Sequence, residues 1–324
     1  MVTHDVLAIE AASTVGEIAR VIAEQVRVTL RRRGAVVGLS GGVDSSVVAA
    51  LCARALGPDR VLGLLMPERH SSSDSLRLGR LAAEHVGITV LVEELGPTLE
   101  SVGCYARQAQ AIRTVFPGFE LSWPFKLTLP SLLEADRLNL FQLTAVDPAG
   151  QVHSARLPHA AYLQLVAATN FKQRLRTTLE YYHADRLHYA VAGTPNRLEY
   201  DQGFFVKQGD GAADLKPIAH LYKTQVYALA EYLGLPDEIR SRPPTTDTYS
   251  LPQTQEEFYF ALRYDAMDLC LWAVDHGVPA AEIADALRLA PEQVERVFAD
   301  VQAKRRAARV LHLPPLMVTA NEGA

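Results

Sequence analysis

Cysteine is scarce in this sequence: Cys52, Cys104 and Cys270 are the three copies in 324 residues, and they lie far apart. No Cys-x-x-Cys pair is present, so the usual zinc knuckle and a disulfide scaffold are both excluded. A small, odd number of cysteines is typical of a reducing compartment. The chain is long enough for a hydrophobic core, without cross-links, to hold the fold.

Long apolar runs are also missing. No stretch approaches the roughly 20 residues that a membrane-spanning helix needs. The first residues do not resemble a signal peptide, because His4, Asp5 and Glu10 interrupt the segment where an apolar core would be required. We therefore expect a cytoplasmic protein that does not contact a membrane.

The sequence also has no excess of positively charged residues. Lysine and arginine number 32 and aspartate and glutamate 37, which gives a net charge of −5 at pH 7. A mildly acidic chain does not favour a general nucleic-acid surface. Hydrophobic residues at 48% and charged residues at 21% are typical of a globular protein.

The first and middle parts of the chain alternate short apolar runs with segments of helical periodicity. This alternation predicts an α/β fold with a doubly wound parallel sheet. The continuous apolar runs at 35–39 and 61–65 are typical of strands that are buried on both faces. Strands are predicted at 35–39, 61–65, 88–92 and 189–192, and helices at 15–33, 43–55, 74–86, 160–182 and 224–233.

Residues 116–160 interrupt the alternation and are predicted to form an insertion beside the sheet. Residues 116–130 are rich in proline and aromatic side chains, and the segments 139–146 and 151–157 flank the turn sequence Asp-Pro-Ala-Gly. This arrangement predicts a β-hairpin. After residue 255 the pattern is helical, with helices expected at 256–276, 280–287 and 291–309. We predict a main domain over 1–275 and a C-terminal helical extension over 276–324.

The sequence Ser-Gly-Gly-Val-Asp-Ser-Ser at 40–46 lies between a predicted buried strand and a predicted helix. Glycines let the backbone approach an anion closely, and the N–H groups at the start of a helix point toward it. Because Asp44 would repel a bare phosphate, its natural role is through Mg²⁺. The segment is neither a Walker loop nor a dinucleotide-binding motif. It therefore predicts a different kind of phosphate loop.

This loop resembles that of the N-type ATP pyrophosphatases, and later segments narrow the resemblance to the ammonia-dependent NAD synthetases. The resemblance covers roughly residues 15–115 and 165–275. The segments that carry it, in order, are NFKQRLR at 170–176, GTPNRLE at 193–199, GDGAADLKPI at 209–218, LYKTQV at 221–226 and PTTD at 244–247. The family implies an adenine nucleotide α hydrolase-like fold, cleavage of ATP between its α and β phosphates, and a homodimer.

On this resemblance Asp44 and Glu199 are the expected Mg²⁺ ligands, and Asp44, Lys223 and Thr245 the expected catalytic residues. The carboxyl ends of parallel strands, where the two carboxylates are placed, are where such sites form. The residues expected to bind ATP are Gly38, Leu39, Ser40, Gly41, Gly42, Asp44, Ser45, Ser46, Met66, Thr194, Lys223 and Thr245. Taken singly, a lysine or a glutamate at such positions is more often a surface residue.

The acceptor substrate is expected to be a carboxylate, activated as an adenylate and then converted to an amide by ammonia. The residues expected to bind it are Asn170, Arg174, Arg176, Lys207, Asp210 and Asp214. Arg174 and Arg176 are two positions apart on one helix and do not share a face. The chain shows no glutaminase, so free ammonia or a separate donor protein is implied. The family substrate is deamido-NAD, and the product is NAD.

Three alternatives stay open at this point. Gln173 stands where the family has alanine, and residues 116–160 precede the substrate helix, so another carboxylate substrate is the first alternative. A sulfur-transfer enzyme is disfavoured because there is no cysteine pair. A nucleotide sensor is the third, with DNA bound by the helices after residue 276, where Lys304, Arg305, Arg306 and Arg309 add basic charge. Packing of those helices on the enzyme is the competing interpretation.

Overall fold

The computed structural model describes residues 2–129, 141–245, 248–260 and 262–318. Its central sheet has four strands, β1 (Ala35–Gly38), β2 (Val61–Leu65), β3 (Thr89–Val92) and β7 (Ala190–Val191). The spatial order is β3-β2-β1-β7 and every pair is parallel, with Ala35 opposite Val61 and Ala190. The predicted α/β fold with a parallel sheet is therefore confirmed.

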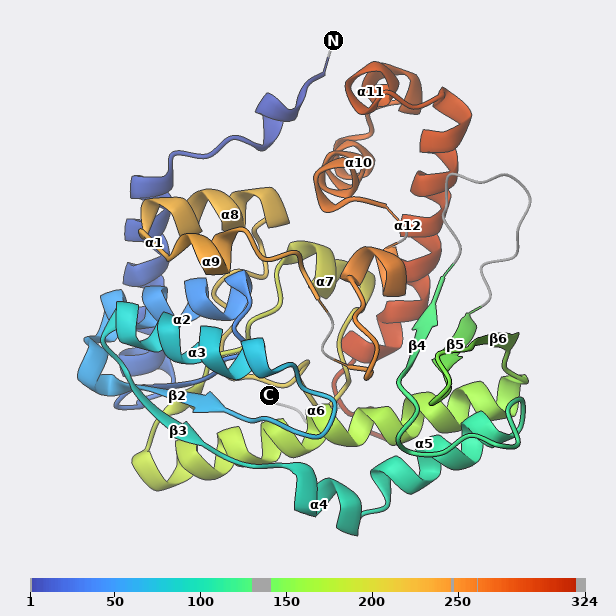
Figure 1. The fold of residues 1–324 in the computed structure, drawn as a ribbon. Helices are drawn as coiled ribbons and strands as arrows, with labels where there is room; N and C mark the ends of the chain where they lie inside the picture. The colour runs from blue at the N-terminus through green and yellow to red at the C-terminus, as the bar shows by residue number, and fades with distance from the viewer. Residues whose placement is uncertain (1, 130–140, 246–247, 261, 319–324) are drawn as a thin grey trace.

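Helices cover both faces of this sheet (Figure 1). Alternate residues of β1 enter different cores, because successive side chains of a strand point to opposite faces. Ala35 and Val37 pack in the core that includes α1 (Ala11–Glu24), α2 (Val43–Leu56) and α8 (Lys223–Tyr232). Val36 packs on the other side, with α4 (Gly96–Ser101), α5 (Cys104–Arg113) and α6 (His159–Leu187).

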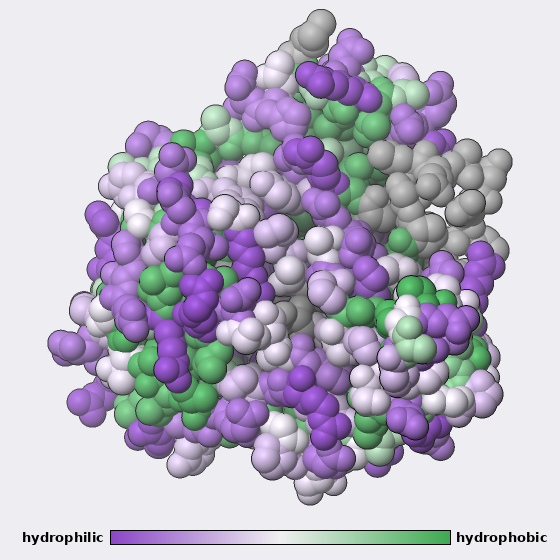
Figure 2. Space-filling model, viewed as in Figure 1, coloured by the Kyte–Doolittle hydropathy of each residue, from purple (hydrophilic) through white to green (hydrophobic). Residues whose placement is uncertain are grey.

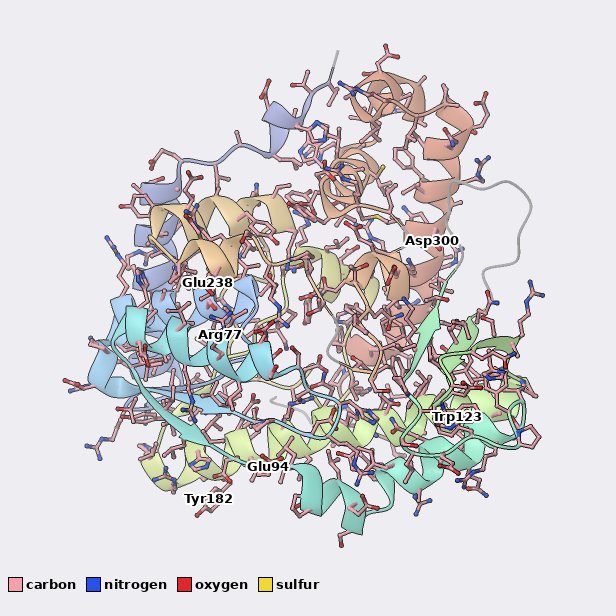
Figure 3. The ribbon with its side chains drawn as sticks, in the orientation of Figure 1. Arg77, Glu94, Trp123, Tyr182, Glu238 and Asp300 are labelled. Carbon is pink, nitrogen blue, oxygen red and sulfur yellow. The ribbon has the colours of Figure 1, made fainter. Side chains whose placement is uncertain are left out.

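Several helices differ in extent from the prediction or were not predicted. The helix expected over 15–33 is α1, which starts at Ala11 and continues into a π-helical turn, η2 (Gln25–Thr29). α3 (Ser73–Val86) matches its prediction, whereas α4, α5, α7 (Arg197–Gln202) and α9 (Asp237–Arg240) were not predicted. α9 is tied to α3 by an ion pair of 2.6 Å between Glu238 and Arg77 (Figure 3). Two short 3₁₀ turns are η1 (His4–Leu7) and η3 (Pro58–Arg60).

The predicted hairpin is present as β5 (Gln142–Val146) and β6 (Val152–Arg156). A third strand, β4 (Phe125–Thr128), pairs antiparallel with β5 and makes a separate three-stranded sheet. The sequence did not predict β4, because its alternation of buried and half-buried side chains lasts for only four residues. This sheet packs on α5 and α6, on the opposite side of the molecule from β3 (Figure 1).

The helix predicted over 256–276 is divided in two. The backbone is extended at Arg263, with ψ 145°, so a π-helical turn, η4 (Glu256–Phe260), precedes a new helix, α10 (Tyr264–His276). α11 (Ala280–Leu287) and α12 (Pro291–His312) follow, and their core includes Leu198 of α7. The domain boundary at residue 275 stays a prediction.

Two basic side chains of α12 contact other parts of the protein, with Lys304 Nζ donating to the Tyr259 carbonyl at 2.7 Å, whereas Arg306 and Arg309 are exposed. Lys304 pairs with Asp300 at 2.7 Å, and Arg305 pairs with Asp201 at 2.7 Å and with Asp275 at 2.6 Å. These contacts favour the interpretation that the C-terminal helices pack on the enzyme rather than bind DNA.

The surface seen in Figure 2 is mainly hydrophilic, with apolar atoms in separate patches. Within the described ranges, no helix has the length and apolar character needed to cross a membrane.

Candidate active site

The phosphate loop is held in shape by its own side chains. It joins β1 to α2, with Gly42 as the N-cap of that helix. The Ser45 hydroxyl accepts from the Ser40 N–H at 3.3 Å and lies 3.2 Å from the Ser40 hydroxyl. Ser45 and Ser46 both donate to the Gly42 carbonyl, at 3.1 and 2.9 Å. The loop is thus closed by hydrogen bonds that span at most five residues.

Gly41 is required at its position for two physical reasons. Its φ is +75°, a conformation that side-chain-bearing residues rarely adopt. A Cβ atom there would also lie 2.7 Å from the Ser75 carbonyl oxygen and 2.9 Å from the Leu78 Cβ. The loop therefore rests directly on the start of α3.

Asp44 and Glu199 come together at the start of α2 and of α7, joined by Asn196. The Asn196 side chain donates to Asp44 Oδ1 at 3.0 Å, and its backbone N–H donates to Glu199 Oε2 at 3.2 Å. Lys223 forms an ion pair with Asp44 Oδ2, and Gln255 Nε2 donates to Glu199 Oε1 at 2.9 Å. The two expected metal ligands, which are 155 positions apart in the sequence, thus share one small polar centre.

The electrostatics of this centre suit a cation. Burial, and then the nearby Asp44 carboxylate, raise the pKa of Glu199 to about 7. Burial opposes the charged form of Lys223, but Asp44 and Glu199 together raise the pKa of its amine. Two carboxylates that repel each other and share one lysine are a donor set that a divalent cation would stabilise. Among the described residues no group of three or more His, Cys, Asp or Glu side chains forms a complete metal site, so phosphate and water oxygens would have to supply the remaining ligands.

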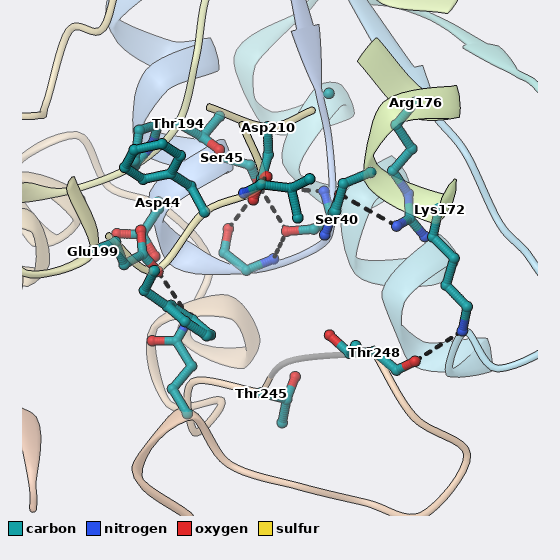
Figure 4. Close-up of a pocket in the computed structure, with 18 of the residues that line it drawn as sticks. Ser40, Asp44, Ser45, Lys172, Arg176, Thr194, Glu199, Asp210, Thr245 and Thr248 are labelled. Carbon is teal, nitrogen blue, oxygen red and sulfur yellow. Dashed lines mark hydrogen bonds between the residues drawn. The ribbon is translucent and has the colours of Figure 1, made fainter. Parts of the chain in front are cut away.

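These residues line one cavity of about 530 Å³ (Figure 4). Most residues expected to bind ATP border it, namely Gly38, Leu39, Ser40, Gly42, Asp44, Ser45, Met66, Thr194, Lys223 and Thr245. Gly41 packs against α3 instead, and Ser46 is fully buried with its hydroxyl bonded to Gly42. Both lie outside the cavity lining and help to fix the conformation of the loop.

One face of α6 forms a long wall of the cavity. Its lining residues recur at helical spacing over 18 positions, which corresponds to roughly 27 Å at 1.5 Å per residue. One end lies at Glu180, beside Gly38 of β1, and burial raises the pKa of that carboxyl to about 7. The other end is Tyr162, stacked on Phe141 of the insertion with ring centroids 5.0 Å apart.

Most of the expected acceptor-binding residues also border the cavity. Asn170, Arg174 and Arg176 lie along α6, and both arginines border the cavity although they are two positions apart on the helix. Lys207 Nζ donates to the carbonyls of Val310 and Leu313 at 2.9 and 3.2 Å, which ties this wall to the end of α12.

The two aspartates of the 209–218 segment differ in position. Asp210 borders the cavity and accepts from the Val206 N–H at 2.7 Å, and burial raises its pKa to about 6. Asp214 lies outside the cavity lining, where it accepts from the Val191 N–H at 2.8 Å and from the Tyr181 hydroxyl at 3.3 Å. Asp214 therefore braces β7.

A buried polar cluster at the cavity wall was not predicted. Lys172 is 1% exposed, and its Nζ donates to Glu68 Oε1 at 2.8 Å and to His70 Nδ1 at 2.9 Å. It also donates to the Thr248 carbonyl at 2.8 Å (Figure 4). Glu68 Oε2 also accepts from the Tyr105 hydroxyl at 2.8 Å. No local pattern in the sequence indicates these contacts. Asn196 is different, since Asn-Arg-Leu-Glu at 196–199 follows the capping-box pattern and forms one.

Comparison with known proteins gives a consistent result. The NAD synthase family model matches residues 14–115 and 135–308. An NH(3)-dependent NAD(+) synthetase of Mesorhizobium japonicum is 61% identical over 311 residues, which are 96% of this chain and 98% of that protein. An enzyme of the same name from Thermotoga maritima is 37% identical over 82% of this chain and 86% of its own length.

Two solved structures share the fold at low sequence identity. The NH3-dependent NAD synthetase of Campylobacter jejuni has a TM-score of 0.62 at 21% identity, over 96% of this chain and 100% of that one. An NMN synthetase of Francisella tularensis has a TM-score of 0.64 at 20% identity, over 96% of this chain and 99% of that one.

Proposed function

The chain belongs to the NAD synthase family, and from this premise we propose that its cavity couples the cleavage of ATP to the amidation of deamido-NAD by ammonia. The products are NAD, AMP and pyrophosphate. The observation that carries the proposal is the centre of Asp44, Glu199 and Lys223 beside a closed phosphate loop. This arrangement is suited to neutralising the charge of a leaving pyrophosphate.

The reaction needs positioning and charge neutralisation, and no protein nucleophile. In the first step, a carboxylate oxygen of deamido-NAD bonds to the α-phosphorus of ATP, the bond to the β-phosphate oxygen breaks, and pyrophosphate leaves. In the second step, the ammonia nitrogen bonds to the acyl carbon, AMP leaves with the former carboxylate oxygen, and a proton is released. These steps give an amide and consume one ATP.

We assign the triphosphate to the phosphate loop, with Ser40 and Ser45 as hydroxyl donors and Lys223 and Thr245 on the side that faces the leaving group. Mg²⁺, held by Asp44 and Glu199, would supply the charge neutralisation that phosphate oxygens need. Asn196 and Gln255 orient the two carboxylates through hydrogen bonds. Asn170, Arg174, Arg176, Lys207 and Asp210 are assigned to the acceptor, and Asp214 acts through the support of β7.

A product assay tests the reaction. Protein, ATP, Mg²⁺ and ammonia are incubated with and without deamido-NAD, and AMP, pyrophosphate and NAD are measured. We expect AMP and NAD in equal amounts, and only when deamido-NAD is present. Release of ADP and phosphate would refute the adenylate, and AMP formation without deamido-NAD would indicate another acceptor.

Replacing Asp44 tests the assignment of the cation. Asp44→Ala should lower kcat by about 10³-fold or more, because charge neutralisation at a phosphoryl centre is worth several kcal/mol. Asp74→Ala is the matched control, since Asp74 is an exposed aspartate in the first turn of the neighbouring helix α3. Asp44→Ala activity within tenfold of the control would contradict the assignment.

A further inference from the structure

The segment 248–255 lies beside the active centre, with Thr248, Tyr249 and Gln255 in the cavity lining. Thr245 pairs with Thr254 in an antiparallel bridge, and the Gln255 N–H donates to the Pro244 carbonyl at 2.9 Å. The Gln255 side chain in turn bonds to Glu199. The position of the 248–255 segment therefore determines where Thr245 and Gln255 lie.

This segment is docked along the outer edge of β4 in the insertion. Phe125 donates its N–H to Ser250 Oγ at 2.9 Å, and its carbonyl accepts from the Leu251 N–H at 3.0 Å. The Gln253 side chain donates to the Leu127 carbonyl. β4 pairs with β5 through its other edge, so the segment occupies the position of an additional strand.

A lysine of β4 strengthens the same contact. Lys126 Nζ donates to the Pro252 carbonyl at 3.4 Å and forms an ion pair of 3.3 Å with Glu257, just beyond the segment. The Glu257 carbonyl accepts from the Leu129 N–H at 3.0 Å. Polar contacts thus join β4 to the chain from Ser250 to Glu257.

Aromatic packing adds a buried contact between the segment and the insertion. Tyr249 is 4% exposed, and its ring lies 5.5 Å from that of Phe125 and 5.6 Å from that of Phe258. All three belong to the cluster that also holds Leu165 of α6. The sheet of the insertion is therefore packed on the same helix that forms the long wall of the cavity.

We propose that the insertion is a positioning platform: β4 holds the 248–255 segment so that Thr245 and Gln255 face the ATP end of the cavity before substrate arrives. The inference rests on the proposed function, because it takes Thr245 as a phosphate contact. Preorganisation of this kind raises affinity by increasing the fraction of protein that is competent to bind.

The test removes the platform contacts without changing a residue that touches the substrates. In the double variant Lys126→Ala, Ser250→Ala, amide hydrogen exchange over 250–255 should become at least tenfold faster. The affinity for a non-hydrolysable ATP analogue should weaken about tenfold, as expected for two or three lost hydrogen bonds. In the full reaction the KM for ATP should rise by a similar factor, while kcat at saturating ATP stays within about threefold.

The matched control is Thr144→Ala, Ser154→Ala. It removes a hydroxyl pair 3.0 Å apart on β5 and β6 of the same sheet, which β4 separates from the segment, and should leave all three measurements unchanged. Ser250→Thr, which keeps a hydroxyl, should restore most of the affinity. If the double variant does not fold, Ser250→Ala alone is measured, with a smaller shift expected.

Two outcomes would overturn the platform. Unchanged exchange over 250–255 would show that β4 does not hold the segment, and faster exchange with unchanged ATP affinity would show that docking does not position Thr245. Both measurements are made without turnover. Failure of the wild-type protein to form NAD would therefore count against the proposed function and leave the platform to be judged on exchange and affinity.

Discussion

Two loops of this protein border the end of the cavity that we assign to ATP, and they are held in opposite ways. The phosphate loop at 40–46 is closed by hydrogen bonds between residues at most five positions apart. The 248–255 segment is held by residues 76 positions away, in Lys172, and 125 or more away, in β4. A site can thus combine one part that is encoded locally with another that depends on the tertiary fold.

The difference has an energetic consequence. A loop that closes on itself depends mainly on its own sequence, on the strand and helix that it joins, and on its contact with α3. A segment held from a distance depends on every element between its anchors, so changes far from the site should reach it. The comparison can be tested by disturbing each loop separately.

The largest effect is expected at the buried anchor of the 248–255 segment. Lys172→Met would leave the Glu68 carboxylate, whose side chain is 0% exposed, without its cation. Removing one partner of a buried pair typically costs about 3–5 kcal/mol. We expect a decrease of that size in the free energy of unfolding, measured by urea denaturation at pH 7.

Two further variants make this test specific. The double variant Lys172→Met, Glu68→Gln should recover more than half of the lost free energy of unfolding, because it also removes the uncompensated charge. Arg77→Met breaks an exposed ion pair with Glu238 and should have little effect on the free energy of unfolding, because solvent screens such pairs. If Lys172→Met costs no more than Arg77→Met, the cluster does not anchor the segment.

The same contrast explains how much could be predicted from the sequence. The two central strands of the sheet, at 35–39 and 61–65, were found because each is a continuous apolar run, and the phosphate loop because seven adjacent residues define it. Glu199 was found through the spacing of a motif. β4, Lys172 and Gln255 were missed because their roles arise from contacts with distant residues, which no local pattern records.

Three predicted site residues lie outside the cavity lining. Gly41, Ser46 and Asp214 support the site without bordering the cavity. Their motifs place them next to residues that do face the cavity, and a motif does not distinguish a residue that contacts the ligand from one that shapes the loop. The orientation of each side chain is decided by packing.

An intermediate effect is expected in the phosphate loop. Gly41→Ala would introduce a side chain at positive φ and a Cβ 2.7 Å from a carbonyl oxygen. The conformational penalty alone is about 1–2 kcal/mol, and the close contact adds to it. We expect the free energy of unfolding to fall by about 2–3 kcal/mol and the affinity for ATP to fall at least tenfold.

Gly87→Ala is a matched control for this change. Gly87 has nearly the same φ, +78°, but a Cβ there would meet nothing within 4 Å. It should cost about 1 kcal/mol and leave ATP affinity unchanged. Equal losses in the two variants would mean that the contact with α3 does not shape the phosphate loop.

The smallest effect is a pH dependence of stability that arises at His70, in the buried cluster that anchors the 248–255 segment. Burial, and then the cation of Lys172, lower the pKa of His70 to about 4, with Glu68 opposing and Arg69 adding to the shift. The unfolded chain, with a pKa near 6.5, binds the proton first, so this residue makes the protein less stable as the pH falls from 6.5 to 4.

His70→Asn should reduce the slope of unfolding free energy against pH in that window, by about 2 kcal/mol in total. His4→Asn, at an exposed position, is the control. An unchanged slope in His70→Asn would mean that His70 takes up its proton equally in the folded and unfolded chains, and that the anchor of the 248–255 segment does not account for the loss of stability in acid.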